Sequence, residues 1–189
     1  MAKISAVDIK RLWYTDEAIL APSSILGTAL STAALASFYG GLASGTFTSI
    51  TEVENVHQDT WTFEEAEPSQ DFYRNQLTGK IYRASRKTDG DVTVNFTIGQ
   101  YDYTTKAAII GGEVIGSNQG WKRPKQPETK YKSIIFLTDD DQLCIIPRAA
   151  FNGREADADK AVGLAVTATE MEPQQFGTPE IWYDAVPTT

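Results

Sequence analysis

Acidic side chains are the first candidates for chemistry in this chain. Glu64, Glu65 and Glu67 lie close together in "FEEAE", and a glycosidase needs two carboxyl groups flanking one scissile bond. In an extended strand, however, Glu65 and Glu67 would share one face, beside exposed polar residues. A solvated acidic strand edge is therefore favoured over an acid/base pair.

A second acidic group, Asp139–Asp141, could be interpreted as a calcium site, because three close carboxylates suit a hard cation. It lacks the spaced ligands of a known calcium loop. The group separates two apolar runs, "SIIFL" and "LCIIP", so a hairpin turn is favoured.

Cysteine and histidine restrict the chemistry further. Cys144 is the only cysteine, which excludes an intramolecular disulfide and a cysteine-based zinc site, and its apolar neighbours favour a core position. His57 is the only histidine, and its polar neighbours favour an exposed strand position over a catalytic base. The chain carries no G-x-G-x-x-G, Walker A, H-E-x-x-H or G-x-S-x-G motif. We expect no enzyme, no catalytic residue, no metal and no cofactor.

Charge is segregated along the chain. The formal net charge is -8 and the pI is about 4.7, which disfavours a protein that grips a phosphate backbone. Residues 52–71 contain seven acidic side chains and no Lys or Arg, whereas residues 74–87 contain five Lys or Arg and no acidic side chain. These blocks could pair across one sheet, or they could dock between copies of the chain.

The N-terminal part contains no charge between Glu17 and Glu52. A signal peptide is disfavoured because acidic residues spoil the positive flank and Pro22 interrupts the apolar run. We interpret about 17–45 as an uncharged insertion or arm that becomes buried, within the chain or against another chain. Residues 23–41 predict a helix, with Ser23 or Ser24 as N-cap and Gly40-Gly41 as its end.

Alternating polar and apolar residues begin at Thr46 and predict strands. Residues 80–99 predict a hairpin that turns at Asp89-Gly90, with an apolar face of Val92, Val94, Phe96 and Ile98. A short helix should follow over 101–110, packing Tyr103, Ala107 and Ile110 on a sheet and ending at Gly111-Gly112.

Further strands are predicted to the end of the chain. Residues 131–151 predict a second hairpin, 152–160 an exposed loop, and 179–185 a last short strand. The strand at 161–171 should bury Val162, Leu164, Val166 and Ala168. The predicted fold is one mainly β domain over 1–189, in which two antiparallel sheets pack as a sandwich or partly open barrel with one flanking α-helix.

The order of these segments resembles the major tail tube proteins of long-tailed bacteriophages. An acidic strand, "QLTGKIYR", an Asp-Gly turn, "VTVNFTI" and a short helix ending at Gly-Gly follow one another as in that family. The stretch "AVGLAVTATEMEP" with a short aromatic terminus resembles its closing strands. The resemblance covers roughly residues 46–184, and the uncharged segment before it is a departure.

The resemblance implies a structural virion protein, made in the bacterial cytoplasm and located in the phage tail. Family members form hexameric rings that stack into a tube, with long loops and terminal arms bridging successive rings. The implied partners are further copies of the chain, the tape measure protein and tail terminators, while DNA passes through without specific binding. An acidic lumen would let DNA slide, and our candidates for it are Glu52, Glu54, Glu64, Glu65 and Glu67. The segment 23–45 is our candidate for burial between rings or subunits.

Two alternative functions remain open from the sequence. One is the inner tube of a contractile injection system or tailocin, which shares the same stacking logic. The other is a carbohydrate-binding or adhesin β-sandwich, in which tryptophans would stack on sugars. The four tryptophans are Trp13, Trp61, Trp121 and Trp182.

Overall fold

The computed structural model describes residues 4–5, 8–21, 25–26 and 30–185. Strands take 44% of the chain and helices 14%, which confirms the prediction of a mainly β fold with few helices. The strands are β1 (Ile9–Thr15), β2 (Thr51–Glu52), β3 (Thr62–Glu65), β4 (Phe72–Arg74), β5 (Ile81–Ala84), β6 (Val92–Ile98), β7 (Glu113–Ile115), β8 (Gly120–Lys122), β9 (Lys130–Thr138), β10 (Gln142–Ala158), β11 (Ala161–Glu170) and β12 (Ile181–Asp184). The helices are α1 (Glu17–Leu20), α2 (Thr32–Ala43) and α3 (Tyr103–Ile110).

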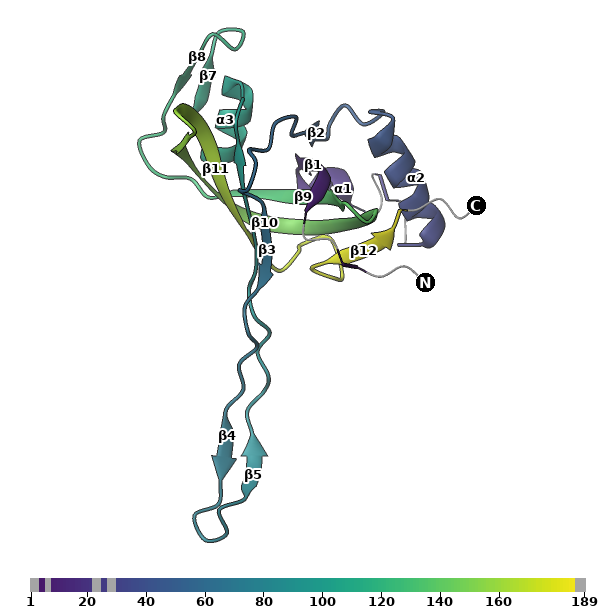
Figure 1. Cartoon of the computed structure of the whole chain (residues 1–189), viewed down its shortest axis with the longest axis vertical. Helices are drawn as coiled ribbons and strands as arrows, with labels where there is room; N and C mark the ends of the chain where they lie inside the picture. The colour runs from purple at the N-terminus through teal and green to yellow at the C-terminus, as the bar shows by residue number, and fades with distance from the viewer. Residues whose placement is uncertain (1–3, 6–7, 22–24, 27–29, 186–189) are drawn as a thin grey trace.

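One antiparallel sheet, in the order β2-β1-β9-β10-β11-β6-β3, forms the body of the molecule (Figure 1). Strand β10 has 17 residues and belongs to both halves of this sheet. Its first part pairs with β9 and β12, and its second part pairs with β11. The register with β9 shifts between Ile146 and Ala149, and such bulges bend strands. We call β2-β1-β9-β10-β12 layer A and β10-β11-β6-β3 layer B.

A first hydrophobic core lies between the two layers. Val92, Val94, Phe96 and Ile98 of β6 are all buried in it, as their alternation predicts. Layer A contributes side chains from β1, β9 and β10, among them Leu12, Ile134, Phe136, Cys144 and Ile146. The sandwich interpretation therefore has its physical basis in this shared core.

A second core lies on the other face of layer A, beneath α1 and α2. Leu35, Phe38 and Leu42 of α2 are buried there, so this part of the uncharged insertion packs on its own sheet. The helix begins after Ser31, whose hydroxyl accepts the Ala34 N–H, while Ser23 and Ser24 lie outside the described residues.

The predicted end of this helix was wrong, because Gly40 and Gly41 lie inside it and it runs to Ala43. A Cβ added at Gly41 would lie 2.3 Å from the ring of Phe47. The second glycine therefore makes room for an aromatic side chain instead of stopping the helix.

The predicted hairpin turn at Asp89-Gly90 was also wrong. Strand β6 pairs with β3 and β11, while β5 pairs with β4. The actual turn follows β4, where Gly79 has φ 68° and the Asn75 N–H donates to the Lys80 carbonyl. Gly90 instead lets the backbones of the two legs lie close together, because an added Cβ would be 1.6 Å from the Ala66 carbonyl oxygen.

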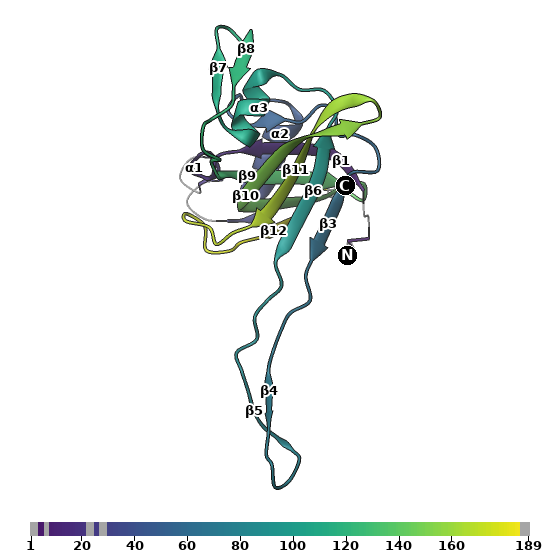
Figure 2. The same cartoon turned by 90° about the vertical axis from the view of Figure 1, so that its left-hand side faces the viewer.

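Residues 66–91 therefore form one long hairpin, which we call the arm. It continues the β3–β6 pair through a bridge between Ser69 and Thr88 and ends in the β4–β5 ladder. Both views show it projecting away from the body (Figures 1 and 2). The first leg, from residue 66 to the end of β4, has about nine residues, which span ~30 Å at a typical strand rise.

Helix α3 covers one end of the first core. It begins after Asp102, whose carboxylate accepts the Thr105 N–H, and ends at Gly111 and Gly112, both with positive φ, as predicted. Its buried side chains are Ile109 and Lys106, whereas Tyr103, predicted to pack, is exposed.

The last third of the chain departs from its prediction at two places, which lie next to each other. The hairpin of β9 and β10 turns at Asp139–Asp141 as predicted, and β12 is the expected last strand. Residues 152–158, predicted as a loop, continue β10 and pair with β11. The turn between them lies at Asp159 and Lys160, both with positive φ. Leu164, Val166 and Ala168 are buried as expected, but Val162 beside this turn is 63% exposed.

Candidate assembly surfaces

The five glutamates predicted for a lumen do not share one surface, although Glu52 and Glu54 line the same pocket. Glu52, at the edge of layer A, binds Arg11 through both carboxylate oxygens, at 2.6 and 2.7 Å. Glu54 follows β2 and lines a pocket. Glu64 and Glu65 lie on opposite faces of β3, and Glu67 lies in the arm. They do not form one acidic wall.

The outer face of layer B is a polar surface without a covering layer. Figure 2 shows strands β10, β11, β6 and β3 toward the viewer, with no other described element over them. Threonine and asparagine side chains occupy its central rows, and we call it the Thr/Asn face. Its residues are Thr62, Thr93, Asn95, Thr97, Thr167 and Thr169.

Side-chain hydrogen bonds order this face. The Asn95 amide donates to the Thr62 hydroxyl at 2.9 Å and accepts from the Thr167 hydroxyl at 2.8 Å. This row crosses three strands, β3, β6 and β11. Charged side chains occur at the two margins of this face. Glu64 of β3 pairs with Thr93 of β6, and Arg154 of β10 pairs with Ala165 of β11.

Three carboxyl groups come together where the arm leaves the body. Glu65 is paired with Val92, Glu170 lies one rung beyond the Thr169–Thr93 pair, and Glu180 precedes β12. Burial, with the charges of Glu180 and Glu65, raises the pKa of Glu170 to about 7. Its Oε2 is inaccessible and has no hydrogen-bond partner among the described residues. The charge of the Glu170 carboxyl group is therefore expected to change near neutral pH.

The outer part of the arm, residues 72–88, is basic and carries exposed apolar side chains, and we call it the arm tip. It holds five basic and no acidic residues. Phe72 is 56% exposed, Tyr82 68% and Leu77 94%. The Arg83 guanidinium stacks over the Tyr73 ring at 5.2 Å. Exposed aromatic and arginine side chains of this kind are typical of protein interfaces.

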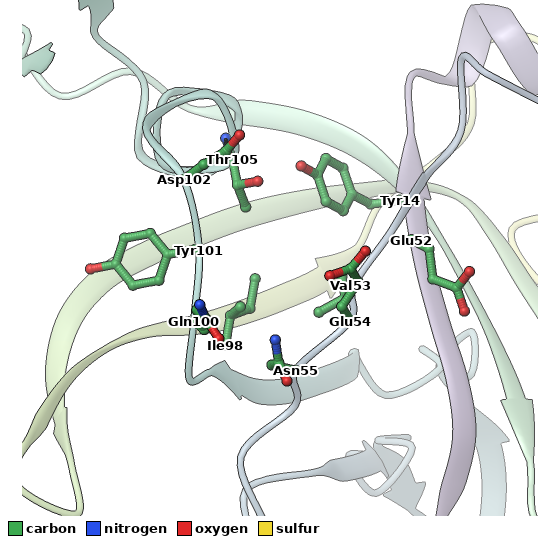
Figure 3. Close-up of a pocket in the computed structure, with 10 residues that line it drawn as sticks. All are labelled: Tyr14, Glu52, Val53, Glu54, Asn55, Ile98, Gln100, Tyr101, Asp102 and Thr105. Carbon is green, nitrogen blue, oxygen red and sulfur yellow. Dashed lines mark hydrogen bonds between the residues drawn. The ribbon is translucent and has the colours of Figure 1, made fainter. Parts of the chain in front are cut away.

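A polar pocket lies at the other end of layer B, and we call it the far-end pocket. Its volume is 410 Å³ (Figure 3). It opens between the start of α3 and the segment after β2. Hydrogen bonding from the Thr105 backbone N–H lowers the pKa of Asp102, so this carboxylate stays charged. Its lining residues are Tyr14, Glu52, Val53, Glu54, Asn55, Ile98, Gln100, Tyr101, Asp102 and Thr105.

A buried lysine fastens α3 beside this pocket. Lys106 donates to Glu155 of β10, and its ammonium lies 4.2 Å from the centre of the Trp121 ring. Hydrogen bonding from Lys106 lowers the pKa of Glu155, which also binds Arg123. The Trp121 indole N–H in turn donates to the Gly111 carbonyl. These contacts tie α3, β10 and the β7–β8 hairpin together, which makes the lysine structural.

The only cysteine and the only histidine of the sequence, Cys144 and His57, both lie in the body. Cys144 is buried, as predicted, and burial raises its thiol pKa. The His57 Nε2 lies 3.2 Å from Asp159 on the β10–β11 turn. Within the described ranges, no three His, Cys, Asp or Glu side chains gather as a metal site. None of the helices in the described part of the chain is long and apolar enough to cross a bilayer.

The tryptophans do not form an exposed platform for sugars. Trp13 is buried in the second core. Trp61 and Trp182 are partly buried and pack on Phe136, with ring centres 4.9 and 5.7 Å away, and Trp121 packs on Lys106. All four therefore act in packing.

No protein-family model matches the chain, and no curated protein is similar to it in sequence. Function is therefore inferred from the surfaces of the molecule. The arm and the far-end pocket were not predicted from the sequence. The stretch "NQLTGK" at 75–80 carries a turn signal at Gly79, which the interpretation of residues 80–99 as a hairpin does not use.

Proposed function

We propose that the protein is a structural, non-catalytic subunit of a phage tail tube, which assembles with its own copies into stacked rings around a DNA channel. The observation that carries this proposal is the arm. It projects from the body, its strands β4 and β5 pair only with each other among the described strands, and an isolated two-stranded hairpin is marginally stable in water (Figures 1 and 2). Its function is therefore to contact another chain.

The open edge of layer B at β3 supports assembly into a ring. Strand β3 pairs with β6 on one side, and its other edge has no partner strand among the described residues. Unpaired strand edges are templates for pairing with another chain. Repetition of one such contact around an axis closes a ring.

The Thr/Asn face is the surface best suited to the channel wall. Hydroxyl and amide groups keep it hydrated, and few cations are available to hold phosphates, because affinity for a DNA backbone comes from lysine and arginine. Glu64 is the one predicted lumen glutamate on this face. We therefore propose a channel wall that is mainly polar, with charged side chains only at its margins, in place of the acidic wall expected from the sequence.

The proposal is tested by electron microscopy and sedimentation of the purified full chain over a range of concentrations. We expect rings or hollow tubes for the natural sequence. A variant in which a short Asn-Gly turn replaces residues 69–88 should keep its circular dichroism spectrum and form no tubes. A folded protein that stays monomeric and binds glycans would overturn the proposal.

A further inference from the structure

We infer that the far-end pocket of one copy receives the arm tip of a second copy, so that the chains join head to tail. This inference rests on the proposed tube, because it names the surface that the arm contacts there. It assigns a role to two features that no contact within the chain explains: an exposed basic arm tip and an open acidic pocket.

The two features lie at opposite ends of layer B. Strand β3 runs toward the arm and β6 runs back from it, so the Glu65–Val92 pair is next to the arm. Ile98 is at the other end of β6, where it pairs with Leu164 and bridges to Val56. The pocket begins at this residue. A contact between opposite ends of identical chains is heterologous and repeats without limit, as a stack of rings requires.

The charges of the two ends are complementary. The arm tip carries five of the 17 basic residues and no acidic residue, which leaves 12 basic and 25 acidic residues in the rest of the chain. In the pocket, Glu54 is exposed and has no ion pair within the described residues, whereas Glu52 is already bound to Arg11. Glu54 is therefore the carboxylate that would receive a cation, with the negative charge of Asp102 nearby, whose oxygens already accept the Thr105 N–H and the Asn118 amide.

The chemistry of the lining also fits the arm tip. Tyr14, Asn55, Gln100 and Tyr101 add hydroxyl and amide groups to the two carboxylates. A volume of 410 Å³ lies within the range of ligand pockets, about 300–1,000 Å³. Arg83, which is already stacked on Tyr73, offers a planar group of donors beside an aromatic ring. Such a pair can fill the pocket and satisfy its acceptors together.

A nucleic acid is a weaker candidate for the arm. The root of the arm carries four acidic residues, so residues 66–91 as a whole hold five basic and four acidic side chains. A phosphate backbone running along the arm would be repelled near the body. The four are Glu67, Asp71, Asp89 and Asp91.

Charge reversal with rescue tests this contact. We expect Arg83→Glu combined with Arg86→Glu to stop self-association in sedimentation velocity, and Glu54→Lys to do the same. A chain carrying all three changes should regain self-association, because the complementary charges are exchanged. Lys125→Glu and Glu172→Lys, at exposed positions outside both surfaces, are the matched controls and should assemble like the natural chain.

Cross-linking locates the contact independently of charge. Leu77→Cys places a thiol on the arm tip, and Gln100→Cys places one in the pocket wall, while the natural Cys144 is buried. An equimolar mixture of the two single variants should give a disulfide-linked dimer under mild oxidation. Mixing Leu77→Cys with Lys125→Cys should not.

Three results would overturn the inference. Tubes that form normally with Glu54→Lys and cross-link elsewhere would leave the proposed function standing and remove the pocket from it. A chain that stays monomeric and uncross-linked at millimolar concentration would count against both. Binding of duplex DNA that is lost on reversal of Arg83 and Arg86 but insensitive to Glu54→Lys would assign the arm to nucleic acid.

Solid head-to-tail filaments with the expected rescue would instead support the contact between arm tip and pocket and refute the hollow tube.

Discussion

The body and the arm are both built from antiparallel strands, but the apolar side chains of the body are buried and those of the arm are exposed. In the body, Phe96 lies between two layers and is 2% exposed. In the arm, Phe72 also lies on an antiparallel strand and is 56% exposed. The sheet of the body has a partner layer on the inner face of each half, whereas the β4–β5 ladder has none among the described residues.

Because of this difference, we expect the body to determine the stability of the folded chain and the arm to determine its association with other chains. Burial of apolar side chains between layers stabilises the folded chain, so changes in the body should alter the free energy of unfolding. The arm adds exposed aromatic and basic side chains that contribute little to that free energy. Changes there should alter the contact with other chains.

The largest expected effect on stability is at the centre of the first core. Phe96→Ala should lower the free energy of unfolding by about 3–5 kcal/mol, because it removes a buried ring and leaves a cavity between the layers. Urea denaturation of the monomer measures this change. A loss below about 1 kcal/mol would contradict the position of Phe96 in the core.

A smaller effect is expected at the junction of body and arm. Gly90→Ala should cost about 1–3 kcal/mol, because its Cβ would meet the Ala66 carbonyl oxygen and the legs of the arm must separate. Thermal unfolding followed by circular dichroism measures this effect. Gly40→Ala is the control: a Cβ there meets no atom within 4 Å, so the change should stabilise helix α2 by up to about 1 kcal/mol.

The carboxyl group of Glu170 should make stability depend on pH. Its pKa is raised from 4.5 to about 7 in the folded chain, so the folded state binds this proton more tightly than the unfolded state. The resulting stabilisation is present below pH 4.5 and is lost as the pH rises through 7.

Because Glu170 is only partly buried, we expect an effect on the order of 1 kcal/mol. Glu170→Gln should flatten the difference in unfolding free energy between pH 5 and pH 8. The nearby exposed Glu172→Gln should leave the pH dependence as in the natural chain. Equal pH profiles for all three proteins would show that Glu170 does not titrate in this range.

The smallest effect on stability is expected in the arm. Phe72→Ala combined with Tyr82→Ala should change the free energy of unfolding by less than about 0.5 kcal/mol per site, because both side chains are exposed. The same variant should lose self-association in sedimentation. A large loss of stability together with unchanged assembly would reverse the assignment of the two regions.

Much of the body could be predicted because its signals are local. The alternation in β6 identified the buried face correctly, and the apolar runs on either side of Asp139–Asp141 predicted the β9–β10 hairpin. The paired glycines Gly111-Gly112 marked the end of α3. Each of these signals depends on a few neighbouring residues and on the period of one element.

The errors arose where a local signal was overruled by distant contacts. Asp89-Gly90 has the composition of a tight turn, but the chain was already paired across that point, Ser69 with Thr88 and Glu65 with Val92. Gly40-Gly41 has the composition of a helix stop, but Phe47 folds back onto it. Polar residues 152–158 suggested a loop, yet the backbone of β11 completes their hydrogen bonds.

The sequence by itself determined the mainly β class, the inner face of layer B and the strong separation of acidic and basic charge, because these follow from residue type and short periods. Only the tertiary structure decided that the basic block is the tip of a projecting arm. It also decided that the five glutamates are dispersed and that a polar pocket stands at the far end of the same layer. These features depend on which strands pair and where β10 bends, and pairing partners far apart in sequence are selected by the packing of the whole core.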